Sequence, residues 1–341
     1  MNTEFLAELG WGDDFARQLA PDEVEGCASL RVTAVHRTRI EALGPGGAVE
    51  LLPVSSLSTG DIAVGDWVLA RDGVALRVLE RRSLVSRKAA GSTVGRQLIA
   101  ANLDALLVVS SCNADFNPAR LERFLVLAAS AGVEPVVVLT KADTCPDPDT
   151  YASEARGLKQ GLAVVVIDAK HADVPAALAG WCRAGRTVAL MGSSGVGKTT
   201  IANALTGRTA AVQDIREDDA KGRHTTTGRY LVKMAAGGWL IDTPGMREVQ
   251  LTDAGEGIHL LFDDLSALAL QCRFSDCKHD REPGCAVRAA IAAGDVTEDR
   301  LHRWQKLQRE DRHNTETVQD AHDRSRAFGR MRRKIPDKRK R

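Results

Sequence analysis

A glycine-rich run that ends in a lysine and a threonine is the part of this sequence best suited to chemistry. It reads Gly192-Ser193-Ser194-Gly195-Val196-Gly197-Lys198-Thr199, and Thr200 follows. In such a P-loop the backbone N–H groups surround phosphates, the lysine reaches the outer phosphates and the last hydroxyl binds Mg²⁺. A strand-like run, Val188–Met191, precedes the loop, and a helix-forming run, Thr200–Leu205, follows it. The pattern predicts a nucleotide site with Mg²⁺, in which Lys198 both binds and assists catalysis.

A second motif indicates which base is bound. Thr140-Lys141-Ala142-Asp143 follows the apolar run Pro135–Leu139 and resembles the guanine-specificity motif of GTPases, usually Asn-Lys-x-Asp. The Asp143 carboxylate would accept hydrogen bonds from guanine N1–H and the 2-amino group, two donors that adenine lacks. The Lys141 stem would pack over the base. Because Thr140 replaces the usual Asn, the side-chain bond from this motif to the P-loop remains an open question.

Two segments match the switch regions of GTPases. The Asp-x-x-Gly pattern of switch II reads Asp242-Thr243-Pro244-Gly245. There Asp242 would hold Mg²⁺ through water, and the Gly245 amide would sense the γ-phosphate. Switch I is expected within residues 222–227, where Thr225 and Thr226 are both candidates for the Mg²⁺ ligand and for a catalytic role.

The attacking water has no obvious partner in switch II. Met246 occupies the position where many GTPases have a glutamine, and a thioether cannot position water. We assign this role to His224 in switch I, because imidazole can position water near neutral pH. The alternative is that His224 only packs against the switch. A fifth motif, over the guanine, would fall at Asp168-Ala169, where the match is poor.

A cluster of sulfur and imidazole ligands lies further along the chain. Cys272, Cys277, His279 and Cys285 form C-x4-C-x-H-x5-C within fourteen residues. Three thiolates and one imidazole complete a tetrahedron, which favours structural Zn²⁺ over a catalytic ion. The alternative is a set of buried thiols without metal. The remaining cysteines have no ligand spacing and are expected to be core thiols: Cys27, Cys112, Cys145 and Cys182.

The elements that would position these motifs follow from hydrophobic patterning. From Leu98 to about Met246, near-continuous apolar runs predict a mostly parallel sheet covered by helices. The expected strands are Ala105–Val109, Pro135–Leu139, Ala163–Ile167, Val188–Met191, Tyr230–Met234 and Trp239–Ile241. A helix is expected between Asn117, as its cap, and Gly132.

The flanking segments have different patterns. Residues 1–29 form a polar lead-in, and short strand-like runs from Leu30 to about Lys88 predict a small antiparallel barrel. The runs are Leu30–Ile40, Ala48–Val54, Trp67–Ala70 and Val74–Glu80. Its arginines suggest a nucleic-acid surface, or else a solvated basic face: Arg31, Arg37, Arg39, Arg77, Arg81 and Arg82.

The C-terminal region is predicted to be helical, with helices at Ala286–Ala293 and around Leu301, Trp304 and Leu307. The segment from Arg324 to Arg341 contains ten Lys/Arg residues and one acidic residue, Asp337. Such a block is commonly a disordered arm for a polyanion, or else a solubilising tail.

Composition narrows the function classes. The chain is 44% hydrophobic and 27% charged, which is ordinary for a globular protein. It contains no run long enough to span a membrane and no signal peptide, and its seven cysteines argue against a closed disulfide framework. We therefore expect a cytoplasmic protein without a membrane partner.

The order of the motifs is unusual, since the base motif precedes the P-loop by about fifty residues. A permuted GTPase, preceded by a small barrel and followed by C-x4-C-x-H-x5-C, resembles the RsgA (YjeQ) family of GTPases that depend on the small ribosomal subunit. Other matching pieces are Val64–Val68, Ala101–Asp104, Gly222–Thr227 and Pro283–Val287. The resemblance implies an OB-like N-terminal barrel, a circularly permuted α/β P-loop GTPase domain and a helical zinc-binding domain.

The expected boundaries are a lead-in at 1–29, the barrel at 30–90, the GTPase domain at 96–250, the zinc domain at 251–320 and a basic tail at 321–341. The resemblance further implies hydrolysis of GTP to GDP, contact with the small ribosomal subunit and its rRNA, a role in late subunit maturation and a monomeric state. Two other readings stay open: an RNA-binding protein that only senses nucleotide, and a signalling or membrane-associated GTPase.

Overall fold

The computed structural model describes residues 3–88, 96–170, 173–208, 229–242, 251 and 253–333, with side chains as far as residue 315. Residues 1–86 and 98–248 form one compact unit, and residues 87–97 and 249–341 form a second. Each unit is considered by itself below. None of the helices in the described part of the chain is long and apolar enough to cross a membrane.

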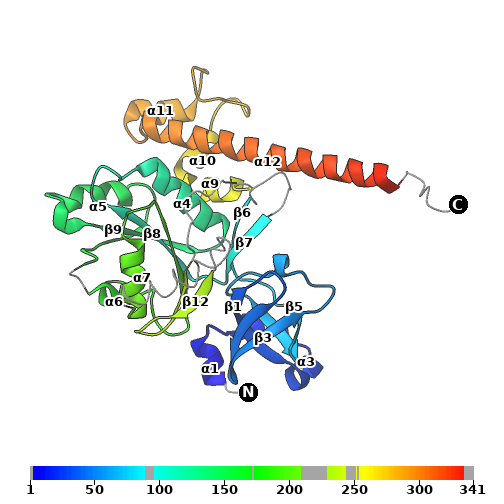
Figure 1. Ribbon diagram of the computed structural model, residues 1–341. Helices are drawn as coiled ribbons and strands as arrows, with labels where there is room; N and C mark the ends of the chain where they lie inside the picture. The colour runs from blue at the N-terminus through cyan, green and yellow to red at the C-terminus, as the bar shows by residue number, and fades with distance from the viewer. Residues whose placement is uncertain are drawn as a thin grey trace. The chain divides into compact units, whose positions relative to one another are not determined.

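The first unit contains a sheet in the order β10-β9-β8-β11-β13-β12. Its strands are β8 (Ala105–Ser111), β9 (Glu134–Thr140), β10 (Ala163–Val166), β11 (Thr187–Gly192), β12 (Tyr230–Lys233) and β13 (Trp239–Asp242). All pairs are parallel except β12–β13. The central strands β8 and β11 are buried on both faces, which explains their uninterrupted apolar runs. The expected parallel sheet is confirmed (Figure 1).

Helices cover this sheet. They are α4 (Pro118–Ser130), α5 (Pro148–Arg156), α6 (Val174–Ala177) and α7 (Lys198–Thr206). The expected start of α4 is confirmed, because the Asn117 side chain accepts a hydrogen bond from Arg120 N at 3.0 Å. Alternate residues of β8, such as Leu107 and Val109, share one core with α6 and α7.

The expected OB-like barrel is also present. Its strands are β1 (Ala28–Val35), β2 (Ile40–Gly44), β3 (Gly47–Pro53), β4 (Trp67–Arg71) and β5 (Val74–Val78). A short helix, η1 (Thr59–Asp61), lies between β3 and β4. The order β1-β2-β3-β5-β4 closes because β4 also pairs with β1. The expected run Leu30–Ile40 is in fact the end of one strand and the start of the next.

The polar lead-in is not a loose segment. It forms α1 (Thr3–Glu8), α2 (Asp13–Ala16) and α3 (Pro21–Gly26). Leu6, Leu9 and Phe15 are almost completely buried, and Trp239 Nε1 of β13 donates to Glu8 O at 2.9 Å. The segment therefore fastens the barrel to the GTPase sheet, which β1 also joins directly where Ala34 pairs with Tyr230.

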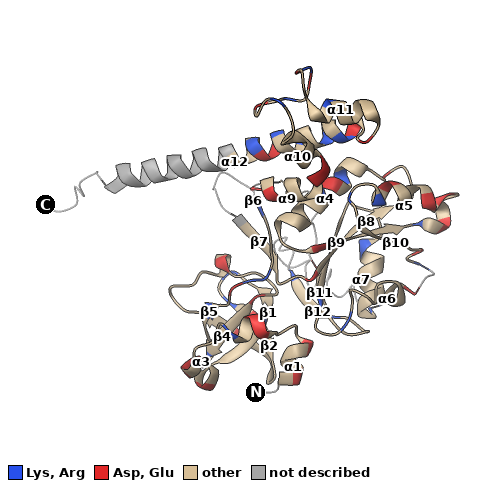
Figure 2. Ribbon diagram, turned by 180° about the vertical axis from the view of Figure 1, so that it is seen from behind, with Lys and Arg blue, Asp and Glu red and all other residues tan. Residues whose placement is uncertain are grey.

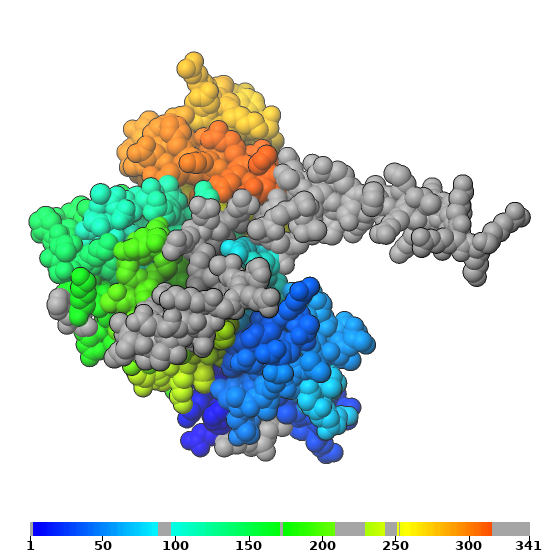
Figure 3. Space-filling view, viewed as in Figure 1, coloured from blue at the N-terminus to red at the C-terminus, as the bar shows by residue number. Residues whose placement is uncertain are grey.

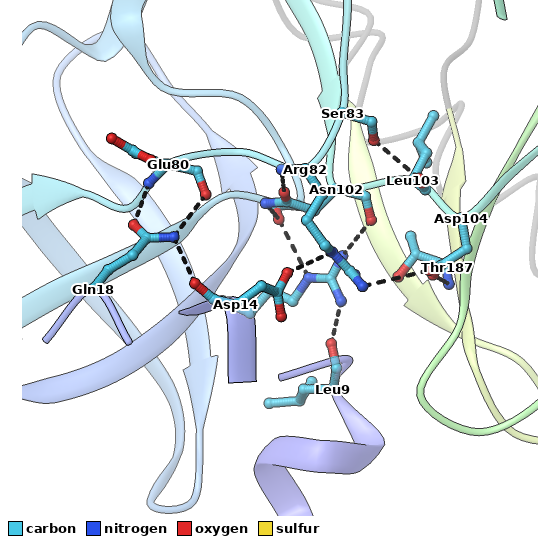
Figure 4. A network of polar contacts seen from close by, with 12 residues as sticks. Leu9, Asp14, Gln18, Glu80, Arg82, Ser83, Asn102, Leu103, Asp104 and Thr187 are labelled. Carbon is cyan, nitrogen blue, oxygen red and sulfur yellow. Dashed lines mark hydrogen bonds and ion pairs between the residues drawn. The ribbon is translucent and has the colours of Figure 1, made fainter. Parts of the chain in front are cut away.

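Five of the six barrel arginines have partners within the unit, which corrects the expectation of a basic surface, while Arg37 is exposed. Arg31 is 0% exposed and donates to the carbonyls of Leu9, Gly65 and Asn102, and burial lowers its pKa to about 10. Others form ion pairs inside the unit: Arg39 with Glu50, Arg77 with Glu23, Arg81 with the buried Asp66, and Arg82 with Asp14 and Asp104. Figure 4 shows Arg82 between its two carboxylates. For the buried Asp66, the pairing with Arg81 means that removing either partner alone would leave a buried charge uncompensated.

Helices dominate the second unit, as expected. They are α9 (Gly255–Leu261), α10 (Asp263–Ala269), α11 (Ala286–Ala293) and α12 (Glu298–Arg333). Leu301, Trp304 and Leu307 form the expected buried stripe. Residues 253–315 make one compact mass, yellow to orange in Figure 3. Strands β6 (Leu84–Lys88) and β7 (Arg96–Ala101), which pair with each other and are divided between the two units, had no signal in the sequence.

Helix α12 is longer than the sequence suggested. It continues without interruption through Arg333, so half of the basic block is helical rather than a disordered arm. Basic and acidic residues are mixed along its first half, as far as residue 315 (Figure 2). The remaining residues of the block, from 334 to 341, lie outside the described residues.

Candidate nucleotide and metal sites

The glycine-rich run forms a loop between β11 and α7. Its glycines have positive φ angles that other residues rarely adopt: 150° at Gly192, 78° at Gly195 and 95° at Gly197. At Gly192 a Cβ atom would lie 2.2 Å from Val109 O, so no other residue fits there. The Lys198 ammonium donates to the carbonyls of Gly192, at 2.8 Å, and Ser193. The loop is thus held in the shape of a phosphate-binding P-loop, with the N-terminus of α7 at its end.

Thr140 answers the question left by its departure from Asn. Its side chain is buried, and its hydroxyl donates to Val196 O in the P-loop at 2.6 Å, with Ser110 O also at 3.1 Å. Gly197 lies close to the same side chain: a Cβ atom at Gly197 would be 3.5 Å from Thr140 Cγ2 and Oγ1. The threonine hydroxyl therefore keeps the bond between base motif and P-loop that the usual amide would make.

The rest of the base motif lies at the carboxyl end of β9. Lys141 has a left-handed conformation, with φ of 58°, and begins the short helix η2 (Ala142–Thr144). Asp143 is exposed, as a group that meets a base must be. Asp168 follows β10 and accepts a hydrogen bond from Lys170 N at 3.0 Å, which forms a turn beside the motif.

The switch residues are only partly described. Asp242 ends β13, which pairs with β11 on the side opposite β8, so this carboxylate lies beside the strand that leads into the P-loop. Thr199 and Thr200 are exposed in the first turn of α7. The other predicted switch residues lie outside the described residues: His224, Thr225, Thr226, Gly245 and Met246. Their roles stay predictions.

The four expected metal ligands come together in the second unit. Their donor atoms all lie within 4.8 Å of one another. Cys272 Sγ is 3.6 Å from His279 Nδ1 and 3.9 Å from Cys285 Sγ, and Cys285 Sγ is 3.5 Å from His279 Nδ1. Metal–sulfur bonds of about 2.3 Å and metal–nitrogen bonds of about 2.0–2.1 Å give tetrahedral edges of about 3.8 Å and 3.6 Å. The spacing fits a single tetrahedral ion, and Zn²⁺ suits this donor set.

The comparisons with known proteins agree with this architecture. The family model described as RsgA GTPase matches residues 78–252. The chain belongs to the RsgA GTPase family. It is 49% identical to the small ribosomal subunit biogenesis GTPase RsgA of Mesorhizobium japonicum, over 91% of each chain. It is 48% identical to RsgA 2 of Vibrio parahaemolyticus, over 98% of this chain and 94% of the relative.

Solved structures give the same result. YjeQ from Thermotoga maritima superposes with a TM-score of 0.61 at 26% identity, covering 82% of this chain and 97% of its own. YloQ, a circularly permuted GTPase, has the same fold, with a TM-score of 0.59 at 22% identity over 87% and 96% of the two chains. As an RsgA GTPase, the protein is a hydrolase that acts on GTP.

Several residues that support these sites carried no sequence motif. Arg120, in the first turn of α4, donates to Ser193 Oγ in the P-loop at 2.6 Å. Glu282 accepts hydrogen bonds from the backbone N–H groups of Lys278, Asp280 and Arg281, which lower its pKa to about 2. This carboxylate organises the metal loop of the RsgA chain.

Burial shifts the pKa of one metal ligand, His279, and of two cysteines outside the metal site. It lowers the pKa of His279, which favours the neutral imidazole that a metal requires. It raises the pKa of Cys112 to about 11 and of Cys182 to about 12, so these two are the expected core thiols. Cys27 and Cys145 are only half-buried, which corrects the expectation that they too lie in the core.

Proposed function

We propose that this GTPase binds the small ribosomal subunit, acts in its late maturation, and hydrolyses GTP with a turnover that the subunit stimulates. The observation that carries the proposal is the intact P-loop, bonded to its base motif through Thr140, in a chain whose relatives are named for small-subunit biogenesis. Contact with rRNA, a monomeric state and a cytoplasmic location belong to the same proposal, as do the domain boundaries expected from the sequence.

The nucleotide and its Mg²⁺ would be held by groups from four segments: the P-loop, the base motif and the two switches. The P-loop amides and Lys198 hold the β- and γ-phosphates, and Asp143 accepts the guanine N–H groups. Thr199 would bind Mg²⁺ directly, and Asp242 would bind it through water. One of Thr225 and Thr226 would supply a further Mg²⁺ ligand. A water attacks the γ-phosphorus, the bond to the bridging oxygen breaks, and GDP and phosphate leave.

Catalysis in the isolated protein should be slow, because phosphoryl transfer depends on positioning and charge stabilisation. Met246 cannot orient the water, and we assign this role to His224. The subunit would bring His224 to the attacking water. This explains why turnover would depend on a partner.

Zinc, in this proposal, is structural and stabilises the second unit through Cys272, Cys277, His279 and Cys285. Electrostatic contact with rRNA falls mainly to the C-terminal basic block. Residues 3–88 contain thirteen Asp/Glu against ten Lys/Arg, and most of the barrel arginines are paired internally. The barrel therefore has no strong positive field for RNA, and its contact with rRNA would depend on shape complementarity.

The test is GTP turnover measured with and without purified small subunits. We expect slow turnover alone and a rise of at least about tenfold with subunits, since ordering of catalytic groups is worth several kcal/mol. Large subunits are the matched control. If small subunits bind without changing turnover, the chain is a nucleotide-sensing RNA-binding protein. If they do not bind, the ribosomal role is wrong.

A further inference from the structure

A groove of about 720 Å³ opens in the second unit, beside the metal site. It lies between α9, α10, the metal loop and the first half of α12. Six of its lining residues bear on the argument: Leu270, Lys278, Trp304, Gln308, Arg309 and Arg312. We call it the α12 groove. A structural zinc ion would account for the four metal ligands but not for this groove.

The α12 groove combines apolar surface with an unused hydrogen-bond donor. Leu270 is 84% exposed, which is unusual for a leucine, while Trp304 is only 4% exposed. The indole Nε1–H of Trp304 is buried and has no acceptor among the described residues. A buried donor without a partner costs free energy, which an acceptor that reached the indole from the groove would recover. The groove thus suits a group with a flat apolar face and a hydrogen-bond acceptor.

The charged residues of the α12 groove are mainly basic. Lys278, Arg309 and Arg312 line it, against one carboxylate, Asp311. Asp311 already accepts a hydrogen bond from Ala254 N at 2.8 Å, so it serves α9. The three basic side chains form no ion pair with any residue in the described part of this unit. They are available to an anionic ligand.

The groove and the basic block share one helix. Arg312 lies on α12, and the same helix continues to Arg324–Arg333, where five arginines occur without an acid. Arg324 is twelve residue steps beyond Arg312, which is about 18 Å of helix. A polyanion held by the basic block could therefore reach the groove with a neighbouring segment.

We propose that the α12 groove binds one unpaired nucleotide of an RNA, with the base against Leu270 and Trp304 and the phosphates near Arg309 and Arg312. Recognition of RNA commonly works through bases that leave the stack and lie on apolar or aromatic side chains. A base offers the flat face and the acceptor that the groove requires. The inference rests on the proposed ribosomal function and adds a specific site to it.

The first test uses the Trp304 indole as a probe. Full-length ¹⁵N-labelled protein, loaded with Zn²⁺ and with GDP and Mg²⁺, is titrated with an RNA hairpin that has a single bulged nucleotide. The Trp304 resonance is identified by its loss in Trp304→Phe. We expect it to shift and saturate with the bulged hairpin and not with the fully paired one. An equal response to both hairpins, or none to either, overturns the proposal.

The second test measures binding to small subunits. Leu270→Ala should weaken it roughly fivefold or more, the lower end of what one stacked base contributes. Leu260→Ala is the matched control, a 44% exposed leucine on α9 outside the groove. Arg309→Ala with Arg312→Ala should lower the log–log salt slope by about 1.4. Arg281→Ala with Lys306→Ala, outside the groove, should lower it less.

The outcomes separate this proposal from the function it rests on. Groove variants that bind subunits like the wild type overturn the nucleotide site, while subunit-stimulated turnover still stands. If the wild-type protein does not bind small subunits, the ribosomal role itself is wrong. A photoreactive side chain at Gln308 should crosslink to RNA on the subunit. A crosslink to protein that resists ribonuclease would assign the groove to a protein partner and overturn the proposal.

Discussion

The bond from Thr140 to the P-loop can be tested with a single substitution. Thr140→Val keeps the volume and β-branching of the side chain and removes only the hydroxyl. Val196 O then loses a donor at 2.6 Å in a buried position, because Thr140 is 1% exposed. A buried acceptor left without its partner costs about 1–3 kcal/mol. Since nucleotide binding needs the loop in its bound shape, part of this cost should appear as lost affinity.

We expect the affinities for GTP and GDP to fall together, by roughly 5- to 10-fold if about 1 kcal/mol appears in binding. Fluorescent nucleotide titrations measure both. The preference for GTP over ATP should not change, because Asp143 still meets the base. Thr140→Asn is the control, since an amide can donate to the same carbonyl. Wild-type affinity in Thr140→Val, or altered base preference without weaker binding, would refute the role of this hydrogen bond.

Three further substitutions test the remaining assignments. Asp143→Asn should weaken GTP binding roughly 10- to 100-fold and admit xanthosine triphosphate, as competition titrations would show; an unchanged nucleotide preference would remove the base-reading role. Cys277→Ala should reduce metal content from about one Zn²⁺ per chain to none and unfold the second unit, while GTP still binds. Wild-type protein that is purified under reducing conditions and contains a Cys272–Cys277 disulfide and no metal would contradict that site. His224→Ala should keep GTP and subunit binding but lower subunit-stimulated turnover roughly 100-fold, and Met246→Ala should change it much less. A full response of the His224 variant to subunits would move the water-positioning role to rRNA or to a backbone group.

The GTPase sheet was predictable because its signals are local. Strands β8 and β11 are buried on both faces, so each appears as an unbroken apolar run, and α4 carries its own cap at Asn117. The P-loop and the metal ligands were equally visible, since the positions that matter lie within fourteen residues or fewer.

Long-range contacts account for what the sequence did not reveal. Leu6 and Phe15 are isolated apolar residues in a polar stretch of sequence, and only the fold shows that both are buried. Arg31 looks like any surface arginine until its three carbonyl partners, from distant parts of the chain, are in place. The hydroxyl of Thr140 likewise has meaning only beside Val196.

The permuted order also sets when the nascent chain can first hold nucleotide. Translation from the N-terminus makes Asp143 first, then Lys198, and Asp242 last. At about 5–20 residues per second, roughly 5–20 s separate the base-reading residue from the last Mg²⁺ group. Strand β8 can pair with β9 early, but its other edge must wait for β11, and the contact of β1 with the GTPase sheet must wait for β12. GTP therefore cannot guide the early folding of this protein, and the first unit becomes a nucleotide-binding body only when nearly all of it has been synthesised.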